Sequence, residues 1–356
     1  MIRRRRYTTA TCLLFALGLP NATAPADPSR SAENSAAEDE ITPELDAGVT
    51  RGLESLAATQ NADGSWDAGR FGKNVAITSV ACLAFMADGN VPGRGAYGEI
   101  VDRGLDFVME NSAENGLLAA DAANGPMYGH GFATLFLGEA YGMTQGGGDT
   151  ARAQRLHEAL IRAVRLIERT QNEEGGWRYN PVPYDADVSV TICQIMALRS
   201  ARNAGLEVSS AVIDKAVEYV RRCQNPDGGF KYQADSGASA WPRSAAGVAS
   251  LFYAGIYNDE AIDRGLEYIE NSALPGRANA RSRAHFHYGH YYAVQAMYLA
   301  GGERWARWWA AIREDLLSTQ NDDGTWTDRS VGDVYGTAMS LIVLQMPKRY
   351  LPIFQK

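Results

Sequence analysis

The segment Thr170-Gln171-Asn172-Glu173-Glu174-Gly175-Gly176-Trp177 decides the fold, because copies of it recur along the chain. The clearest copies share a Gln in second place, a Gly in sixth place and an aromatic residue in eighth place. Six copies can be traced, and they begin at Thr59, Glu110, Thr170, Cys223, Glu270 and Thr319. The copies at Glu110 and Glu270 are degenerate and lack the Gln. A spacing of about 47 to 60 residues indicates an internal structural repeat.

Each copy lies between two helix-like segments of different character. The segment before it is amphipathic, with apolar residues at steps of three and four, as at Val212, Ala216 and Tyr219. These outer helices are predicted over residues 52–59, 104–110, 152–170, 209–223, 259–271 and 305–319. The segment after each copy is apolar nearly all round, and these inner helices are predicted over residues 75–86, 131–140, 188–198, 245–253, 291–299 and 335–344.

A helix that is apolar on every side must be buried on every side, so the apolar helices are expected inside a layer of amphipathic ones. The terminal copies show no polar capping face, which favours a closed ring over an open array. The predicted fold class is therefore all-α, with six outer and six inner helices. The loops between them are interpreted as scaffold clamps, in which Gly permits a positive φ and the Gln amide bonds exposed backbone ends.

The first residues of the chain have the layout of a secretory signal peptide. A basic run at Arg3–Arg6 precedes a short apolar run at Leu13–Leu19. The small residues of Asn21–Ala24 follow, as before a signal-peptidase cleavage site. We expect residues 1–26 to be this signal peptide, and hence export to the periplasm or the extracellular space. Residues 27–44 are expected to form a flexible acidic linker, residues 45–346 the ring, and residues 347–356 a C-terminal tail.

Composition excludes several classes of function. The chain has 356 residues, of which 46% are hydrophobic, and a net charge of −8, which argues against a nucleic acid partner. The signal-peptide run is too short for a membrane span, so no stable span is expected. Outside the leader, Cys82, Cys193 and Cys223 are an odd number and read as buried packing thiols. No spaced cluster of Cys and His suggests a structural zinc site.

The Gln-x-x-Asp-Gly-x-Trp segments resemble the QW motifs of the prenyltransferase and squalene-cyclase superfamily. The resemblance covers roughly residues 45–346. It implies an α/α toroid, a ring of six outer and six inner helices around a central cavity. It does not imply an activity by itself, because one fold can carry different functions.

Class II terpene cyclases of this superfamily carry an Asp-x-Asp-Asp motif at the start of an inner helix. Here Asp185-Ala186-Asp187-Val188 stands at such a start, so Asp187 matches the proton donor and Val188 replaces the last Asp. The resemblance thus makes Asp187 and Asp185 the candidate catalytic residues. The alternative is that Asp187 is an N-cap and Asp185 a turn residue.

Protein prenyltransferases, another branch, hold a catalytic zinc through an Asp-x-Cys pair and a His. The pair Asp185-x-Asp187 has no Cys, and the fourth repeat has Trp241-Pro242-Arg243-Ser244 at the corresponding helix start. His290 lies at an inner-helix start without a complete ligand set. We therefore expect no metal and no cofactor.

If all inner helices run the same way, their N-termini share one mouth of the ring. The candidate ligand-binding residues there are Tyr128, His130, Trp241, Arg243, Tyr288, His290, Asp333 and Tyr335. Helix N-termini also give that mouth a positive potential.

The first hypothesis is an exported toroid that binds a small or hydrophobic ligand at this mouth. A terpene-cyclase-like enzyme with Asp187 as acid is the second hypothesis, and a glycan-active α/α barrel the third. The sequence names no protein partner.

Overall fold

The computed structural model describes residues 40–67, 69, 72–120, 125–144, 150–276 and 285–355. The predicted signal peptide, residues 1–26, and most of the predicted linker lie outside the described residues. The first described helix begins at Pro43, inside the segment that was expected to be linker. Thr42 caps this helix by accepting a hydrogen bond from the amide of Leu45 at 3.2 Å.

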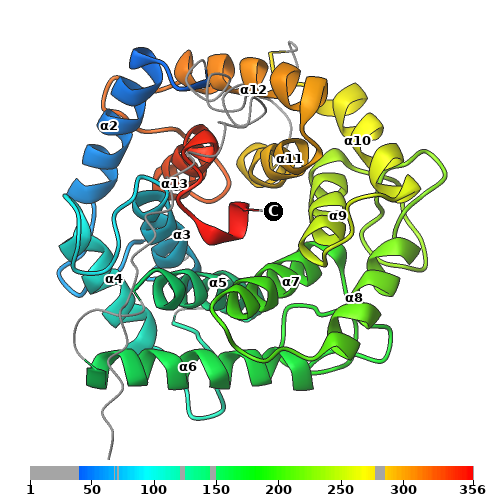
Figure 1. Ribbon diagram of the computed structural model, residues 1–356, viewed down its shortest axis with the longest axis horizontal. Helices are drawn as coiled ribbons and strands as arrows, with labels where there is room; N and C mark the ends of the chain where they lie inside the picture. Colours follow the sequence, from blue (N-terminus) through cyan, green and yellow to red (C-terminus); the bar gives the residue numbers. More distant parts are fainter. Residues whose placement is uncertain are drawn as a thin grey trace, which may run out of the picture. The chain divides into compact units, whose positions relative to one another are not determined.

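Helices form two concentric layers (Figure 1). In the described part of the chain the inner layer consists of α3 (Val75–Met86), α5 (Met127–Thr144), α7 (Val188–Asn203), α9 (Trp241–Tyr253), α11 (Phe286–Ala300) and α13 (Asp333–Leu344). The outer layer consists of α2 (Pro43–Ala58), α4 (Gly98–Glu110), α6 (Thr150–Arg169), α8 (Ser210–Arg222), α10 (Glu260–Ala273) and α12 (Gly302–Leu317). The described residues contain isolated β-bridges but no strand, so the predicted all-α class is confirmed.

Burial follows the two sequence patterns. In the outer helix α8 only Ala216, Tyr219 and Val220 are buried, on one stripe, whereas in α3 every residue except Ala76 is buried. One neighbouring layer can bury an apolar stripe, but a helix that is apolar all round needs neighbours on every side to be buried. None of the described helices is long and apolar enough to cross a bilayer.

The repeated motif joins consecutive repeats. The side-chain amide of Gln171 donates to the carbonyl of Gly175 in its own loop at 2.9 Å and to that of Val212 in the next outer helix at 2.8 Å. The indole of Trp177 is buried and donates to the carbonyl of Ile167, at the end of the preceding outer helix, at 2.8 Å. The motifs that begin at Thr59, Cys223 and Thr319 repeat the Gln contacts, so the scaffold role predicted for them is confirmed.

The last motif closes the ring. The amide of Gln320 donates to Gly324 in its own loop at 3.0 Å and to Gly48 in α2 at 2.8 Å. Figure 1 shows α12 beside α2, so the two ends of the repeat array meet. The closed ring predicted from the sequence is therefore confirmed.

The loop of the motif Thr170–Trp177 has no space for a side chain at Gly175. Its φ is +99°, and a Cβ there would lie 2.1 Å from the carbonyl oxygen of Lys215 in α8. We expect Gly175→Ala to lower the free energy of unfolding by about 2 to 4 kcal/mol, because it adds a backbone clash to an unfavourable φ. Urea unfolding followed by circular dichroism measures this. The control is Gly205→Ala, which has a φ of +90° but nothing within 4 Å of the added Cβ. An equal loss in both variants would show that φ alone matters.

The C-terminal tail lies inside the ring. After α13 the chain forms two short 3-10 helices, η2 (Met346–Lys348) and η3 (Pro352–Phe354). Figure 1 shows this end of the chain at the centre of the inner layer, and η3 packs against α5 and α7. Nothing in the repeat pattern predicted this position.

Candidate ligand cavity

The N-terminal ends of the inner helices surround one cavity of about 980 Å³. All six inner helices, or the residues just before them, contribute to its wall, through Asn74, Tyr128, Ser189, Arg243, Tyr288 and Tyr335 among others. The prediction that these helices run in one direction and share one mouth is therefore confirmed.

Tyrosines dominate the aromatic part of the cavity wall. Tyr128, Tyr179, Tyr232, Tyr288 and Tyr335 all line it, together with Phe132 and apolar residues such as Val75 and Ile77. The hydroxyl of Tyr288 donates to the carbonyl of Ser189 at 3.3 Å, and those of Tyr179 and Tyr232 are hydrogen-bonded to each other. No carboxylate is among the described residues that line the cavity.

Arg243 is the cation of the wall. Its Nε donates to the carbonyl of Phe230 at 3.0 Å and its Nη2 to that of Ala238 at 2.6 Å. These two bonds hold the guanidinium beside the cavity. None of the ion pairs between described residues involves Arg243. Four of the residues expected at the mouth, Tyr128, Arg243, Tyr288 and Tyr335, therefore line the cavity.

His130 and His290 were expected at the same mouth, and that placement is wrong. The ring of His130 faces the outer layer, where Nδ1 accepts from the amide of Leu118 at 3.1 Å and Nε2 lies 3.2 Å from the carbonyl of Ala163. His290 is buried among the rings of Trp241, Phe286 and Trp308. Burial lowers the pKa of His130 to about 4 and that of His290 to about 3, so both are neutral packing residues at physiological pH.

Trp241 and Asp333 also lie outside the cavity wall. The Trp241 ring fills the space above Gly289, where a Cβ would lie 2.1 Å from it. Asp333 is exposed at the first turn of α13, where its charge favours the helix N-terminus. Asp185 is partly exposed and forms an ion pair with Arg178.

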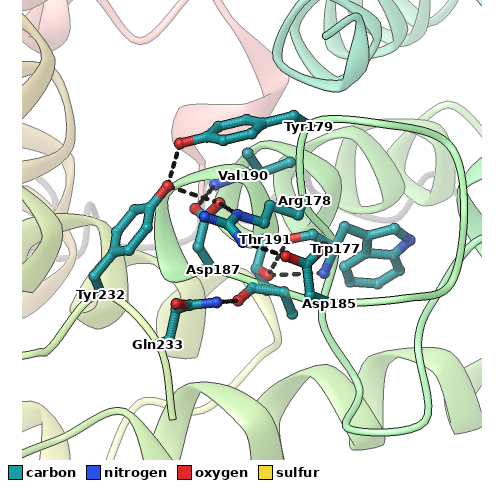
Figure 2. A network of polar contacts seen from close by, with 10 residues as sticks. Trp177, Arg178, Tyr179, Asp185, Asp187, Val190, Thr191, Tyr232 and Gln233 are labelled. Atoms are coloured by element: carbon teal, nitrogen blue, oxygen red, sulfur yellow. Dashed lines mark hydrogen bonds and ion pairs between the residues drawn. The ribbon is translucent and has the colours of Figure 1, made fainter. Parts of the chain in front are cut away.

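Asp187 is fully buried at the N-terminus of α7 and is the centre of a polar network (Figure 2). Its Oδ1 accepts from the amide of Val190 at 2.9 Å, which is N-cap geometry. Its Oδ2 accepts from the hydroxyl of Tyr232 at 3.1 Å and lies 3.7 Å from Nε of Arg178. The interpretation of Asp187 as an N-cap therefore describes its contacts, and Tyr232, which bonds its carboxyl, is itself part of the cavity wall.

Burial raises the pKa of Asp187 from its ordinary 3.8 to about 6, against the opposing effects of the Val190 amide, the Tyr232 hydroxyl and the Arg178 charge. A residue that protonates an alkene must be strongly acidic and must face the substrate. Asp187 has neither property here, because its pKa is raised and its side chain has no exposed surface.

The raised pKa makes stability depend on pH. The folded chain binds the Asp187 proton more tightly than the unfolded chain, so this contribution stabilises at low pH and is lost as pH rises from about 4 to about 6. Asn also caps helices but does not titrate. We expect wild type to lose about 1.5 kcal/mol more than Asp187→Asn between pH 5 and pH 7.5 in urea unfolding. Equal losses in the two proteins would contradict the assignment. Every other titrating group is common to both proteins and cancels.

Sequence reasoning missed Tyr179 and Tyr232. Each stands two residues after the aromatic residue of its motif, Trp177 or Phe230, in consecutive repeats. The guanidinium of Arg178 lies over both tyrosine rings, 5.1 Å from the centre of one and 5.8 Å from that of the other. The shared position after two neighbouring motifs was the signal that could have identified them.

Residues 148–280 match the family described as squalene-hopene cyclase C-terminal domain. This part of the chain is thus similar to squalene-hopene cyclases. Drimenyl diphosphate synthase of Streptomyces showdoensis is 27% identical over 190 residues, which are 51% of this chain and 35% of that protein. The toroid thus spans about a third of the length of that curated relative.

Two classes of enzyme are among the solved structures with a similar fold. The type II terpene cyclase MstE from Scytonema is 14% identical, with a TM-score of 0.60 over 86% of this chain and 99% of that chain. A variant of it was solved in complex with its substrate, geranylgeranyl dihydroxybenzoate. The GH76A alpha-1,6-mannanase from Salegentibacter sp. HEL1_6 is 7% identical, with a TM-score of 0.65 over 86% of this chain and 99% of that chain. At these identities the likeness shows the fold alone.

Proposed function

We propose that the squalene-cyclase-like toroid binds an isoprenoid-like molecule, apolar along most of its length with one polar, oxygen-bearing end. The observation that carries this proposal is the character of the cavity. It holds about 980 Å³, at the upper end of the range of ligand pockets, and its described wall is apolar and aromatic without a carboxylate. Binding of an apolar molecule to such a wall is favourable because it removes a large apolar surface from water.

The polar end of the ligand is assigned to the side of the cavity where Arg243 and the tyrosine hydroxyls lie. Arg243 presents a positive charge that no described carboxylate neutralises, and α9 begins without a side-chain cap on its first amides. Hydroxyls, guanidinium and helix amides all donate hydrogen bonds to oxygen. A ligand end rich in acceptors is therefore favoured over a cationic one.

Glycan hydrolysis fits this wall poorly, although a mannanase shares the fold. Glycosidases of the usual kind need two carboxyl groups, one on each side of the scissile bond. Asp185 and Asp187 are the carboxyl pair before the inner helix α7, but Asp187 is enclosed and Asp185 is held in its ion pair with Arg178. Neither lines the cavity.

Cyclisation by protonation is the second candidate function, and one observation favours it. Tyr232 both lines the cavity and donates to Asp187, so a shift of this one side chain would bring the carboxyl to the cavity. The similarity to drimenyl diphosphate synthase supports the same candidate. Incubation of the protein with squalene or geranylgeraniol, followed by gas chromatography and mass spectrometry, tests it. A cyclic product formed by wild type and not by Asp187→Asn would establish an enzyme.

The binding proposal is tested in two measurements. Mass spectrometry of an organic extract of the protein, purified from its native host, should find one isoprenoid species near one mole per mole of protein. Calorimetric titration of ligand-free protein with geranylgeraniol should show saturable binding, and titration with mannotriose should show none. An empty extract together with no geranylgeraniol binding would refute the proposal, and binding of mannotriose instead would support the glycan hypothesis.

We also propose that the chain is exported. This rests on the basic and apolar runs of residues 1–26, which lie outside the described part of the structure. N-terminal sequencing of the protein from its host tests it, because export predicts a first residue near Ala22–Ala26 and retention predicts residue 1 or 2.

A further inference from the structure

The rear end of the ring, opposite the cavity mouth, is filled by the C-terminal segment, residues 346–355. Leu351, Ile353 and Phe354 are buried there, each with at most 2% of its surface exposed. The segment turns through Arg349, whose φ of +56° is unusual for a residue with a side chain. None of these residues lines the front cavity, so the segment occupies a separate place in the ring.

One carboxylate of the ring holds this segment. Glu139 on α5 is buried, and its Oε2 accepts from the backbone amide of Ile353 at 3.0 Å. Its Oε1 accepts from the hydroxyl of Ser200 on α7 at 2.7 Å. Glu139 thus joins two inner helices to the tail. Glu139 does not line the front cavity, and its hydrogen bonds are not part of the repeated Gln and Trp motifs.

The other groups around Glu139 do not change charge near neutral pH. Tyr253 on α9 and Tyr291 on α11 face it, and burial raises the pKa of both hydroxyls well above their ordinary value of 10, partly because of the Glu139 charge. The positive charge of Arg199 on α7 acts on the same Tyr253 and opposes this rise. Farther along the tail, Lys348 pairs with Asp88 at 2.7 Å. Between pH 5 and pH 8, Glu139 is therefore the titrating group of this contact.

We propose that the rear end of the ring is a second binding site, which the C-terminal segment occupies as an internal, releasable ligand anchored on Glu139. A buried carboxylate that accepts a backbone amide, flanked by pockets for apolar side chains, is a peptide-binding arrangement. Release of the segment would expose those pockets and give the ring an opening behind the front cavity. This inference does not depend on the identity of the front-cavity ligand.

The direction of its pH dependence follows from linkage. Burial raises the pKa of Glu139 from its ordinary 4.5 to about 7, against the hydrogen bonds from Ser200 and Ile353. Release would hydrate the carboxyl and return it toward 4.5, so the closed state holds the proton more tightly than the open one. Low pH therefore favours the closed state, and opening increases as pH rises from 4.5 to 7 and then levels off. Between pH 5 and pH 7 the two values correspond to an increase of about 40-fold in the opening equilibrium.

Hydrogen exchange of the full chain, read by mass spectrometry on peptides that cover residues 346–355, tests the proposal. After correction for the intrinsic pH dependence of exchange, protection of the tail should fall about 40-fold from pH 5 to pH 7 and change little from pH 7 to pH 8. In Glu139→Gln the tail protection should not depend on pH. The matched control Glu218→Gln, on the exposed face of α8, should behave as wild type.

Peptides from α7 (residues 188–203) distinguish tail release from unfolding of the whole ring. Protection that changes equally in α7 and in the tail would overturn the proposal, and so would tail protection that is flat in wild type. Ser200→Ala removes one donor to the carboxylate and should move the transition to higher pH, which keeps the test decisive if Glu139→Gln does not fold.

Discussion

Ala76→Trp should raise the dissociation constant for geranylgeraniol at least 100-fold, because the indole would occupy the volume that the ligand needs. Ala76 is the second residue of α3, lines the cavity and is the one residue of that helix that is not buried. A 100-fold loss corresponds to about 2.7 kcal/mol of binding free energy, which a blocked apolar pocket readily accounts for. Calorimetric titration of ligand-free wild type and variant measures it.

The substitution should leave the fold intact, because the new side chain extends into the cavity and the amide of Ala76 keeps its bond to Asn74 at 2.8 Å. The matched control is Glu218→Trp on the exposed face of α8, which adds the same indole far from the cavity. Unchanged affinity in Ala76→Trp would place the ligand elsewhere, whereas an equal loss in both variants would indicate a general effect of an added indole.

Trp177→Ala should lower the free energy of unfolding by about 3 to 5 kcal/mol, the usual cost of removing a large aromatic side chain from a packed core. The indole is 1% exposed and bonds the carbonyl of Ile167 at 2.8 Å. The variant therefore leaves a cavity and removes the indole donor to the carbonyl of Ile167, which keeps its hydrogen bonds from Thr170. Urea unfolding monitored by circular dichroism gives the value.

Trp177→Phe separates the two contributions. The motif that begins at Cys223 already carries an aromatic ring without an N–H at this place, Phe230, which is fully buried. We expect Trp177→Phe to cost about 1 kcal/mol, mainly for the lost hydrogen bond from the indole to the carbonyl of Ile167. If Trp177→Ala costs less than Trp177→Phe, the ring of Trp177 does not hold the repeats together.

The layered ring could be predicted because its cause is local and repeated. An all-round apolar segment such as Val75–Met86 has one physical solution, burial on every side, and the predicted bounds of that helix match the structure. The outer helices were predicted too short where polar residues begin them. α2 starts at Pro43, nine residues before the predicted start at Gly52, because a Thr42 cap and a first-turn Pro favour helix without apolar periodicity.

The cavity wall was predicted less well because sequence spacing does not give the rotation of a helix about its axis. Tyr128 and His130 are two residues apart, and at 3.6 residues per turn their side chains point about 200° apart. Only one of them can face the cavity, and it is Tyr128. The pair Tyr288 and His290 repeats the same relation, and again the tyrosine faces inward. The helical period alone could have excluded one member of each pair.

The position of the tail could not be predicted, because it depends on contacts between segments that are distant in sequence. Ile353 meets Glu139 across 214 positions of the chain, and no periodic pattern encodes that pairing. A lone Glu in an apolar helix was nevertheless a visible signal, since a buried carboxylate requires a donor.

The bond from Gln320 to Gly48 also limits how such a protein can change in size. In an open array a repeat can be added at either end, because each unit contacts only its neighbours. Here the last repeat is already bonded to the first. An additional repeat would therefore have to separate α12 from α2 and change the angle between all other neighbouring repeats. Closure of the ring thus fixes the number of repeats. The loops and the two chain ends are the places where residues can be added without breaking this contact.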